Sequence, residues 1–272
     1  MMQTQNGFVQ TNGIQIHYER SGEDKPPFIF CHGITDNGRC LLRLAEHFAP
    51  RFDVILVDAR GHGLSDKPET GYSSDEHADD LEGLINTLKL ENPILYGHSM
   101  GARTVSRFAA KYPDIPKAVI LEDPVYITPI TKKELKERDL WLKARQVEVV
   151  RWKTMSEEEL LQMAEEDPHP DWSSEEKKEW AIAKTQVVPQ VFEVGTVMHT
   201  IREDFPLVTC PVLILKADAN PHTKAANQKA ATLIPNGKII HVKGTGHNIR
   251  RDDFTATIQF VGEFLTEIME TG

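Results

Sequence analysis

The sequence predicts an α/β fold in which a mostly parallel, eight-stranded sheet is flanked by helices and carries an inserted helical cap. Short apolar runs alternate with helical patterns over residues 28–121 and again after residue 211, which is typical of parallel sheets with helices on both faces. Residues 126–205 contain no strand-like run. The chain of 272 residues, 40% of them apolar, is long enough for one large core with such an insertion.

The chain is expected to open with an antiparallel hairpin, because residues 8–10 and 14–18 flank the pair Asn12-Gly13, the strongest short hairpin signal. Beyond it, short apolar runs predict buried strands, and apolar residues at helical spacing predict helices. The elements predicted before the cap are the strand 28–31, the helix 41–48, the strand 54–57, the helix 75–88, the strand 94–96, the helix 102–112 and the strand 117–121.

The alternation stops at Pro124 and resumes at Pro211, where we expect the strand 211–215, the helix 225–233, the strand 239–242 and the helix 254–268. We therefore divide the chain into a core, residues 1–125 and 206–272, and a helical cap or lid, residues 126–205. All four tryptophans lie in the cap. Some of them are expected to form an apolar roof over a substrate pocket and the others to pack the cap itself. These residues are Trp141, Trp152, Trp172 and Trp180.

The composition argues against several classes of protein. A net charge of −10 disfavours nucleic acid and anionic membranes as partners, because binding phosphate needs an excess of Lys and Arg. The cysteines Cys31, Cys40 and Cys210 show no paired spacing, so we expect buried thiols. We expect no cofactor, no metal, no export signal and no membrane span, and we expect a cytoplasmic location. The oligomeric state is left open.

The run from Asn92 to Ala102 is an apolar strand that stops at Gly97-His98-Ser99-Met100-Gly101 and turns directly into a helix. A Gly-x-Ser-x-Gly sequence on a sharp strand-to-helix turn pushes the serine away from the backbone, and its glycines avoid collisions with the neighbouring strand and helix. The required order of strand, turn and helix is present. Ser99 is therefore the candidate nucleophile.

A nucleophilic serine needs a base for its proton and donors for the oxyanion that forms on the substrate. His247 lies in a loop between the last strand and the final helix, from which an imidazole can reach over the strand ends, so it is the candidate base. The run from Phe30 to Thr35 ends a strand in a His-Gly turn. The backbone N–H groups of Ile34 and Met100 are expected to form the oxyanion hole.

Together these motifs resemble the α/β-hydrolase fold enzymes, and the resemblance covers essentially the whole chain. It is carried by His32-Gly33, the loop 58–66, the turn 97–101 and Gly246-His247. The resemblance implies the fold predicted above and a serine hydrolase activity, and it says little about the substrate.

In most members of that family, the acid that orients the histidine follows the strand after the cap. Aligned on this pattern, the sequence places Asn220 there, and an amide is a poor partner for an imidazolium. Two carboxylates could replace it, Asp218 two residues before Asn220 and Asp123 at the end of the strand before the cap. Some family members carry the acid on that earlier strand at the spacing from the serine that Asp123 has from Ser99. We expect Asp123 to be the acid, with Asp218 as the alternative.

An activated serine beside an oxyanion hole predicts acyl transfer to water through an acyl-enzyme. We expect a hydrolase that cleaves carboxylic esters or lactones of small apolar substrates. Carbon–carbon bond hydrolases, thioesterases and perhydrolases resemble the chain equally well, and a ligand receptor that retains the triad is the alternative outside catalysis. Haloalkane dehalogenases and epoxide hydrolases of this fold use an aspartate nucleophile, which Ser99 argues against.

Overall fold

An eight-stranded sheet forms the centre of the protein in the computed structural model, which describes residues 4–193 and 200–270. The strand order is β1-β2-β4-β3-β5-β6-β7-β8; β2 runs antiparallel to β1 and β4, and the other neighbouring pairs are parallel. This confirms the predicted mostly parallel sheet. The strands are β1 Gln5–Thr11, β2 Ile14–Arg20, β3 Pro27–Cys31, β4 Asp53–Val57, β5 Ile94–His98, β6 Ala118–Glu122, β7 Val212–Lys216 and β8 Gly237–His241.

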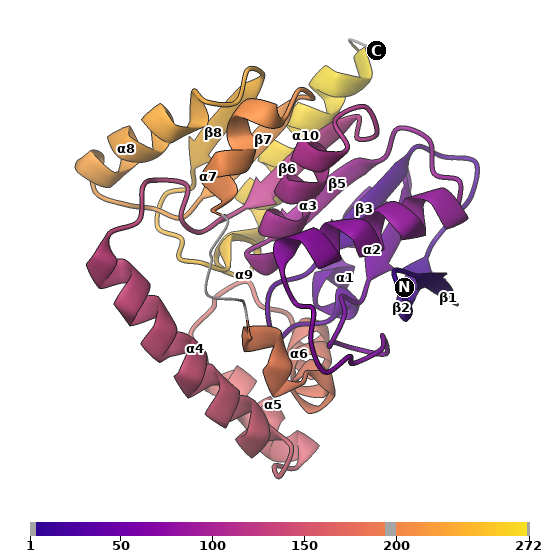
Figure 1. Ribbon diagram of the computed structural model, residues 1–272, viewed down its shortest axis with the longest axis vertical. Helices are drawn as coiled ribbons and strands as arrows, with labels where there is room; N and C mark the ends of the chain where they lie inside the picture. The colour runs from indigo at the N-terminus through magenta and orange to yellow at the C-terminus, as the bar shows by residue number, and fades with distance from the viewer. Residues whose placement is uncertain (1–3, 194–199, 271–272) are drawn as a thin grey trace.

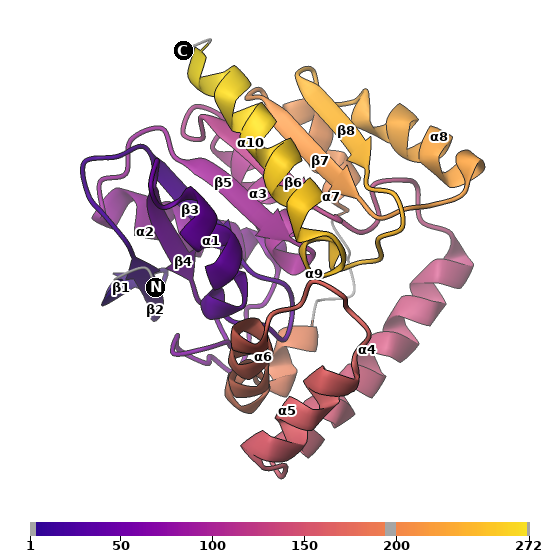
Figure 2. The same cartoon turned by 180° about the vertical axis from the view of Figure 1, so that it is seen from behind.

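Helices cover both faces of the sheet, with α2, α3 and α8 on one face and α1 and α10 on the other (Figure 1, Figure 2). The alternation of side chains along β3 divides the core accordingly. Ile29 packs in the cluster that includes α2 and α3, whereas Phe28 and Phe30 pack in the cluster that includes α1 and α10. The helices of the two faces are α1 Leu42–Phe48, α2 Ser74–Thr87, α3 Met100–Lys111, α8 Pro221–Ala231 and α10 Phe254–Glu270, and the short α9 Ile249–Asp252 precedes α10.

A separate group of helices lies beyond one end of the sheet (Figure 1). Each of its three long helices begins with a Ser or Thr whose side chain and a Glu three residues later cap each other's backbone N–H groups. These helices share an apolar cluster that includes Trp152, Leu160 and Val187. The group, called the helical layer below, consists of α4 Lys132–Trp152, α5 Glu157–Glu166, α6 Ser174–Gln186 and the 3-10 turn η2 Pro189–Phe192.

The helical layer lies within the predicted cap of residues 126–205, and the division into core and cap stays a prediction. Residues 194–199 of that cap are outside the described residues. The short helices α7 Ile201–Asp204 and η3 Phe205–Leu207 pack differently from the layer, because Ile201 and Phe205 are buried in the sheet cluster with α3. This packing favours a core that resumes near residue 200 rather than at 206. Among the described residues, no helix combines the length and hydropathy that a membrane span needs.

Candidate active site

Ser99 lies at the turn between β5 and α3 and has the backbone angles φ 52° and ψ −104°, which a residue with a side chain rarely adopts. Two close backbone approaches build this turn. A Cβ on Gly101 would lie 2.0 Å from the carbonyl oxygen of Cys31, and a Cβ on Gly97 would lie 2.3 Å from that of Gly101. Glycine is therefore required on both sides of Ser99, as the sequence motif indicated.

Ser99, His247 and Asp123 form a continuous hydrogen-bonded chain. The Oγ of Ser99 is 2.9 Å from Nε2 of His247, and Nδ1 of His247 is 2.6 Å from Oδ2 of Asp123. The register of the sheet makes this meeting possible, because His98 on β5 is paired with Glu122 on β6, and Ser99 and Asp123 are the next residues along the two strands. With Asp123 on Nδ1, the imidazole presents Nε2 to the serine hydroxyl.

The other oxygen of the Asp123 carboxylate is also occupied. Its Oδ1 lies 2.6 Å from Nζ of Lys216 and accepts a hydrogen bond from the backbone N–H of Ala217 at 3.1 Å. Burial raises the pKa of Asp123, but the hydrogen bond to His247 and the charge of Lys216 outweigh this and hold the pKa at about 2. Asp123 is therefore ionised in neutral solution.

The alternative acid, Asp218, contacts α8 and the first part of the loop that carries His247. Its carboxylate lies 2.6 Å from Nζ of Lys224 and accepts a hydrogen bond from the backbone N–H of Gly244 at 2.8 Å. Asn220, at the position where most of the family carries the acid, caps the first turn of α8 by accepting from the N–H of Thr223 at 2.9 Å. In this chain, Asn220 in the segment after β7 caps α8, and Asp218 in the same segment binds the loop that leads to His247.

The two expected oxyanion donors border the same cavity as Ser99. Ile34 and Met100 both line it. Among the backbone hydrogen bonds of turns and loops in residues 4–193 and 200–270, none is donated by the N–H of Ile34 or of Met100. Gly33 lets the Ile34 loop approach the nucleophile, since a Cβ there would lie 2.7 Å from Nδ1 of His98 and 3.7 Å from Cβ of Ser99. This arrangement suits two N–H groups that converge on one oxygen.

His98 holds the loop of the candidate base. Its Nε2 lies 3.0 Å from the carbonyl oxygen of His247, so Nε2 carries the proton and donates it. Burial lowers the pKa of His98 to about 3, and the imidazole is therefore neutral. Sequence motifs locate this residue beside the nucleophile but do not show that it reaches the loop of the histidine.

A cavity of about 560 Å³ lies between the sheet and the helical layer. Ser99 and His247 border it from the core, and three of the four predicted tryptophans, Trp141, Trp152 and Trp180, border it from the layer. Trp172 differs from the prediction, because it is buried outside the lining, 5.7 Å from the ring of Trp180. An apolar roof is thus present, and it contains three of the four indoles.

The cavity is also lined by arginines, which no motif in the sequence indicates. Arg138 and Arg145 come from α4, and their partners there are the neighbouring carboxylates of Asp139 and Glu148. Nη1 of Arg138 and Nε of Arg145 are nevertheless buried atoms with no hydrogen-bond partner in the described part of the chain. Helical spacing was the available signal, since Arg138 and Arg145 share a face with other lining residues of α4. These four residues are Arg138, Trp141, Leu142 and Arg145.

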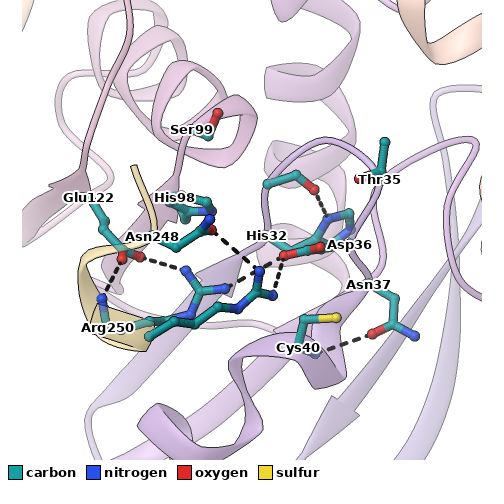
Figure 3. A network of polar contacts seen from close by, with 12 residues as sticks. His32, Thr35, Asp36, Asn37, Cys40, His98, Ser99, Glu122, Asn248 and Arg250 are labelled. Atoms are coloured by element: carbon teal, nitrogen blue, oxygen red, sulfur yellow. Dashed lines mark hydrogen bonds and ion pairs between the residues drawn. The ribbon is translucent and has the colours of Figure 1, made fainter. Parts of the chain in front are cut away.

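A buried ionic network supports the site from below (Figure 3). The carboxylate of Glu122, next to Asp123 in the chain, lies 2.9 Å from Nη1 of Arg250 and accepts from the backbone N–H of Arg250 at 3.0 Å. Asp36 of the Ile34 loop lies 3.0 Å from Nη2 of Arg251. Burial raises the pKa of Glu122, but the charge of Arg250 outweighs it and brings the pKa to about 2. The network joins the loops that carry the candidate acid, the candidate base and an expected oxyanion donor.

The described residues contain no group of three or more His, Cys, Asp or Glu side chains arranged to hold a metal ion. The chemistry that the site can perform with its own side chains is nucleophilic attack by Ser99, with proton transfer through His247.

Comparisons with known proteins show which family and which relatives this chain is similar to. A family model described as alpha/beta hydrolase fold matches residues 26–250. A 2-(acetamidomethylene)succinate hydrolase from Mesorhizobium japonicum is 44% identical over 126 residues, a match that spans 46% of this chain and 44% of that protein. An N-formylmaleamate deformylase from Pseudomonas putida is 28% identical over 270 residues, which cover 95% of this chain and 96% of the relative.

Solved structures show the same likeness. The crystal structure of an E-2-(acetamidomethylene)succinate hydrolase has a TM-score of 0.78 and 28% identity and covers 97% of this chain and all of its own. A solved N-formylmaleamic acid deformylase from Pseudomonas putida has a TM-score of 0.74 and 25% identity, with 94% of this chain covered and all of the other.

Proposed function

Because this chain belongs to the alpha/beta hydrolase fold family, we propose that it is a serine hydrolase that cleaves the amide bond of a small N-acyl compound bearing carboxylates. The observation that carries the proposal is the hydrogen-bonded chain of Ser99, His247 and Asp123, in which Ser99 and His247 border a cavity that arginines also line. The triad supplies the reaction, and the arginines supply the preference for an anion.

The proposed reaction begins when Oγ of Ser99 attacks the acyl carbon and His247 Nε2 accepts the hydroxyl proton. The N–H groups of Ile34 and Met100 stabilise the oxyanion of the tetrahedral intermediate. When the C–N bond breaks, His247 returns the proton to the leaving nitrogen, and an acyl-enzyme is left on Ser99. Water then attacks this ester, with His247 as base, and releases the acid. Asp123 stabilises the imidazolium in both halves of the reaction.

The choice of a carboxylate-bearing substrate is supported by the cavity wall. A guanidinium recognises a carboxylate through parallel N–H donors, and a buried donor without a partner favours a ligand that can accept its hydrogen bond. Arg138 and Arg145 line the cavity together with three indoles, and each has one buried N–H donor without a partner among the described residues. The net charge of −10 means that the chain as a whole repels anions. The preference for a carboxylate therefore comes from the arginines of the cavity and not from the overall charge.

The choice of an amide is supported by the two named relatives. Their names describe an acetamido and an N-formyl group on compounds with carboxylates, and hydrolysis of either group breaks a C–N bond. The ester or lactone activity expected from the sequence is the second candidate, because the same triad cleaves esters through the same acyl-enzyme. Carbon–carbon bond, thioester and perhydrolase reactions and the receptor role stay alternatives, and no feature of the cavity favours them over the amide.

A matched panel tests the proposal. N-formyl and N-acetyl derivatives of small dicarboxylic amides are compared with the corresponding O-acyl esters. Each compound is also prepared in a neutral form, with its carboxylates converted to carboxamides. We expect turnover of the anionic amides with kcat/KM at least about 10-fold above that of the neutral ones, the range of a charge-assisted hydrogen bond. Ser99→Ala should release no formate or acetate. A preference for neutral esters, with the amides inert, would support the second candidate instead.

A further inference from the structure

Lys184, on α6 of the helical layer, reaches out of the layer and into the loop that carries an expected oxyanion donor. Its side chain is 1% exposed. Nζ donates to the carbonyl oxygen of Thr35 at 2.7 Å, approaches the hydroxyl of Thr35 at 2.9 Å and lies 3.2 Å from Oδ1 of Asp36. The three donors of the ammonium therefore have three partners in one turn of the core.

The turn that Lys184 contacts has an unfavourable backbone at Thr35. It is closed by a hydrogen bond from the N–H of Asp36 to the carbonyl of Gly33 at 3.1 Å, with Ile34 and Thr35 as its central residues. Thr35 has φ 71°, a value that glycine adopts easily and a β-branched residue rarely does. The surroundings must hold such a residue in place, and the contacts of Lys184 with both oxygens of Thr35 do so.

We propose that Lys184 is a positioning residue for the reaction: by holding the Thr35 carbonyl, it fixes the turn that aims the Ile34 N–H at the oxyanion. This inference rests on the proposed function of Ser99. The Ile34 N–H and the peptide between Ile34 and Thr35 belong to the same turn. A change of φ at Thr35 therefore changes the direction in which the Ile34 N–H points. The effect falls on the transition state, because the donor acts only where negative charge develops.

The same ammonium connects the turn to the cavity wall and to the loop of the candidate base. It lies 4.2 Å from the ring centroid of Trp180, an indole that lines the cavity. Through Asp36 it shares a carboxylate with Arg251, whose Nη2 is 3.0 Å from Oδ2 and whose Nη1 lies 3.4 Å from the side-chain oxygen of Asn248. Lys184 thus joins the helical layer, the oxyanion turn and the residue after His247.

The test compares Lys184→Met with Lys178→Met, an exposed lysine on the same helix. Kinetics are measured with p-nitrophenyl acetate as substrate. Binding is measured with two inhibitors: phenylboronic acid, which forms a tetrahedral adduct with the serine, and benzoate, which forms no adduct. For Lys184→Met we expect kcat to fall about 10- to 100-fold, as for a donor displaced from the oxyanion, with KM changed less than about threefold. Inhibition by phenylboronic acid should weaken by a similar factor, while inhibition by benzoate and the kinetics of Lys178→Met stay unchanged.

Equal weakening of phenylboronic acid and benzoate, or unchanged kcat in the folded Lys184→Met protein, would overturn the inference. If Lys184→Met does not fold, Lys184→Gln gives the same comparison, because it keeps a neutral donor and should retain part of the selectivity for the tetrahedral adduct. Ser99→Ala separates the two proposals. If Ser99→Ala still turns over, the proposed function fails; if it is inactive and Lys184→Met is normal, the positioning role alone fails.

Discussion

Lys216 places its ammonium 2.6 Å from Oδ1 of Asp123, while the other oxygen of that carboxylate, Oδ2, faces His247. Lys216 is the last residue of β7, the strand that β6 pairs with in parallel, and its Nζ also donates to the carbonyl of Pro124 at 2.9 Å. The strand after the helical layer therefore contributes a cation to the candidate acid, whereas in most of the family that the sequence resembles the acid itself follows this strand.

This pair predicts how stability changes in acid. The pKa of Asp123 is about 2 in the folded protein and 3.8 ordinarily, so its ionised form stabilises the fold by about 2 kcal/mol above pH 4. That contribution is lost as the pH falls through about 2. Lys216→Met should raise the pKa of Asp123, which makes the contribution smaller and its loss earlier. Urea unfolding from pH 5 to pH 2.5 measures the difference in the free energy of unfolding between the wild type and Lys216→Met, and this difference should shrink as the pH falls. Lys229→Met, at an exposed position, is the control.

The acid assignment predicts unequal effects of two isosteric changes. Asp123→Asn should lower kcat by about 10⁴, because an amide neither stabilises the imidazolium nor fixes its tautomer. Asp218→Asn should lower kcat less than about 10-fold, since it weakens only the contacts to Lys224 and Gly244 at the start of the loop. Steady-state kinetics on one substrate settle the order. The opposite order would assign the acid to the strand after the helical layer.

The cavity arginines predict a selective change in substrate binding. Arg138→Gln and Arg145→Gln should each raise KM for a carboxylate-bearing substrate by about 10- to 100-fold, the range of a hydrogen bond to a charged group. The KM of the matching neutral substrate should change little. Arg151→Gln, an exposed position on the same helix, provides the control. Equal losses for anionic and neutral substrates would mean that these side chains only shape the helix.

The backbone at Ser99 predicts a gain in stability when the side chain is removed. Its φ of 52° and ψ of −104° lie in a region that only glycine adopts without strain. Ser99→Gly should raise the free energy of unfolding by about 1 kcal/mol, after the entropic cost of glycine in the unfolded chain is subtracted. Ser99→Ala keeps Cβ and should show no such gain in urea unfolding. Equal stability of the two variants would contradict strain as the cause.

Local patterns were sufficient to predict the sheet, the turn at Ser99 and the loop of His247. Each depends on residues adjacent in the chain, such as glycines at positions where a residue with a side chain does not fit. The order of the strands then brings the loops to one edge of the sheet. Asp123 lies beside His247 because parallel register fixes which strand ends are neighbours, and its role as the acid stays a prediction.

Features that depend on how the helical layer docks could not be read from the sequence. In the sequence, nothing distinguishes Trp172 from the tryptophans that line the cavity. Its ring nevertheless packs against Trp180, with its centroid 4.4 Å from the guanidinium carbon of Arg251. Lys184 sits in a helix rich in charge, where a lysine is ordinarily exposed. Only the docking of α6 onto the turn at Thr35 shows that it is buried.

The burial of Lys184 against Asp36 sets a condition on chimaeras made by recombining this protein with its relatives. A foreign set of helices grafted onto this sheet would have to supply a cation at the same position. Without it, Asp36 would lose one of the charges that keep the pKa of this buried carboxyl low, although the arginines of α9 would still face it. From the proposed role of Lys184, we expect an exchange that carries Lys184 with its helix to preserve catalysis, and one that omits it to lose both this contact and activity.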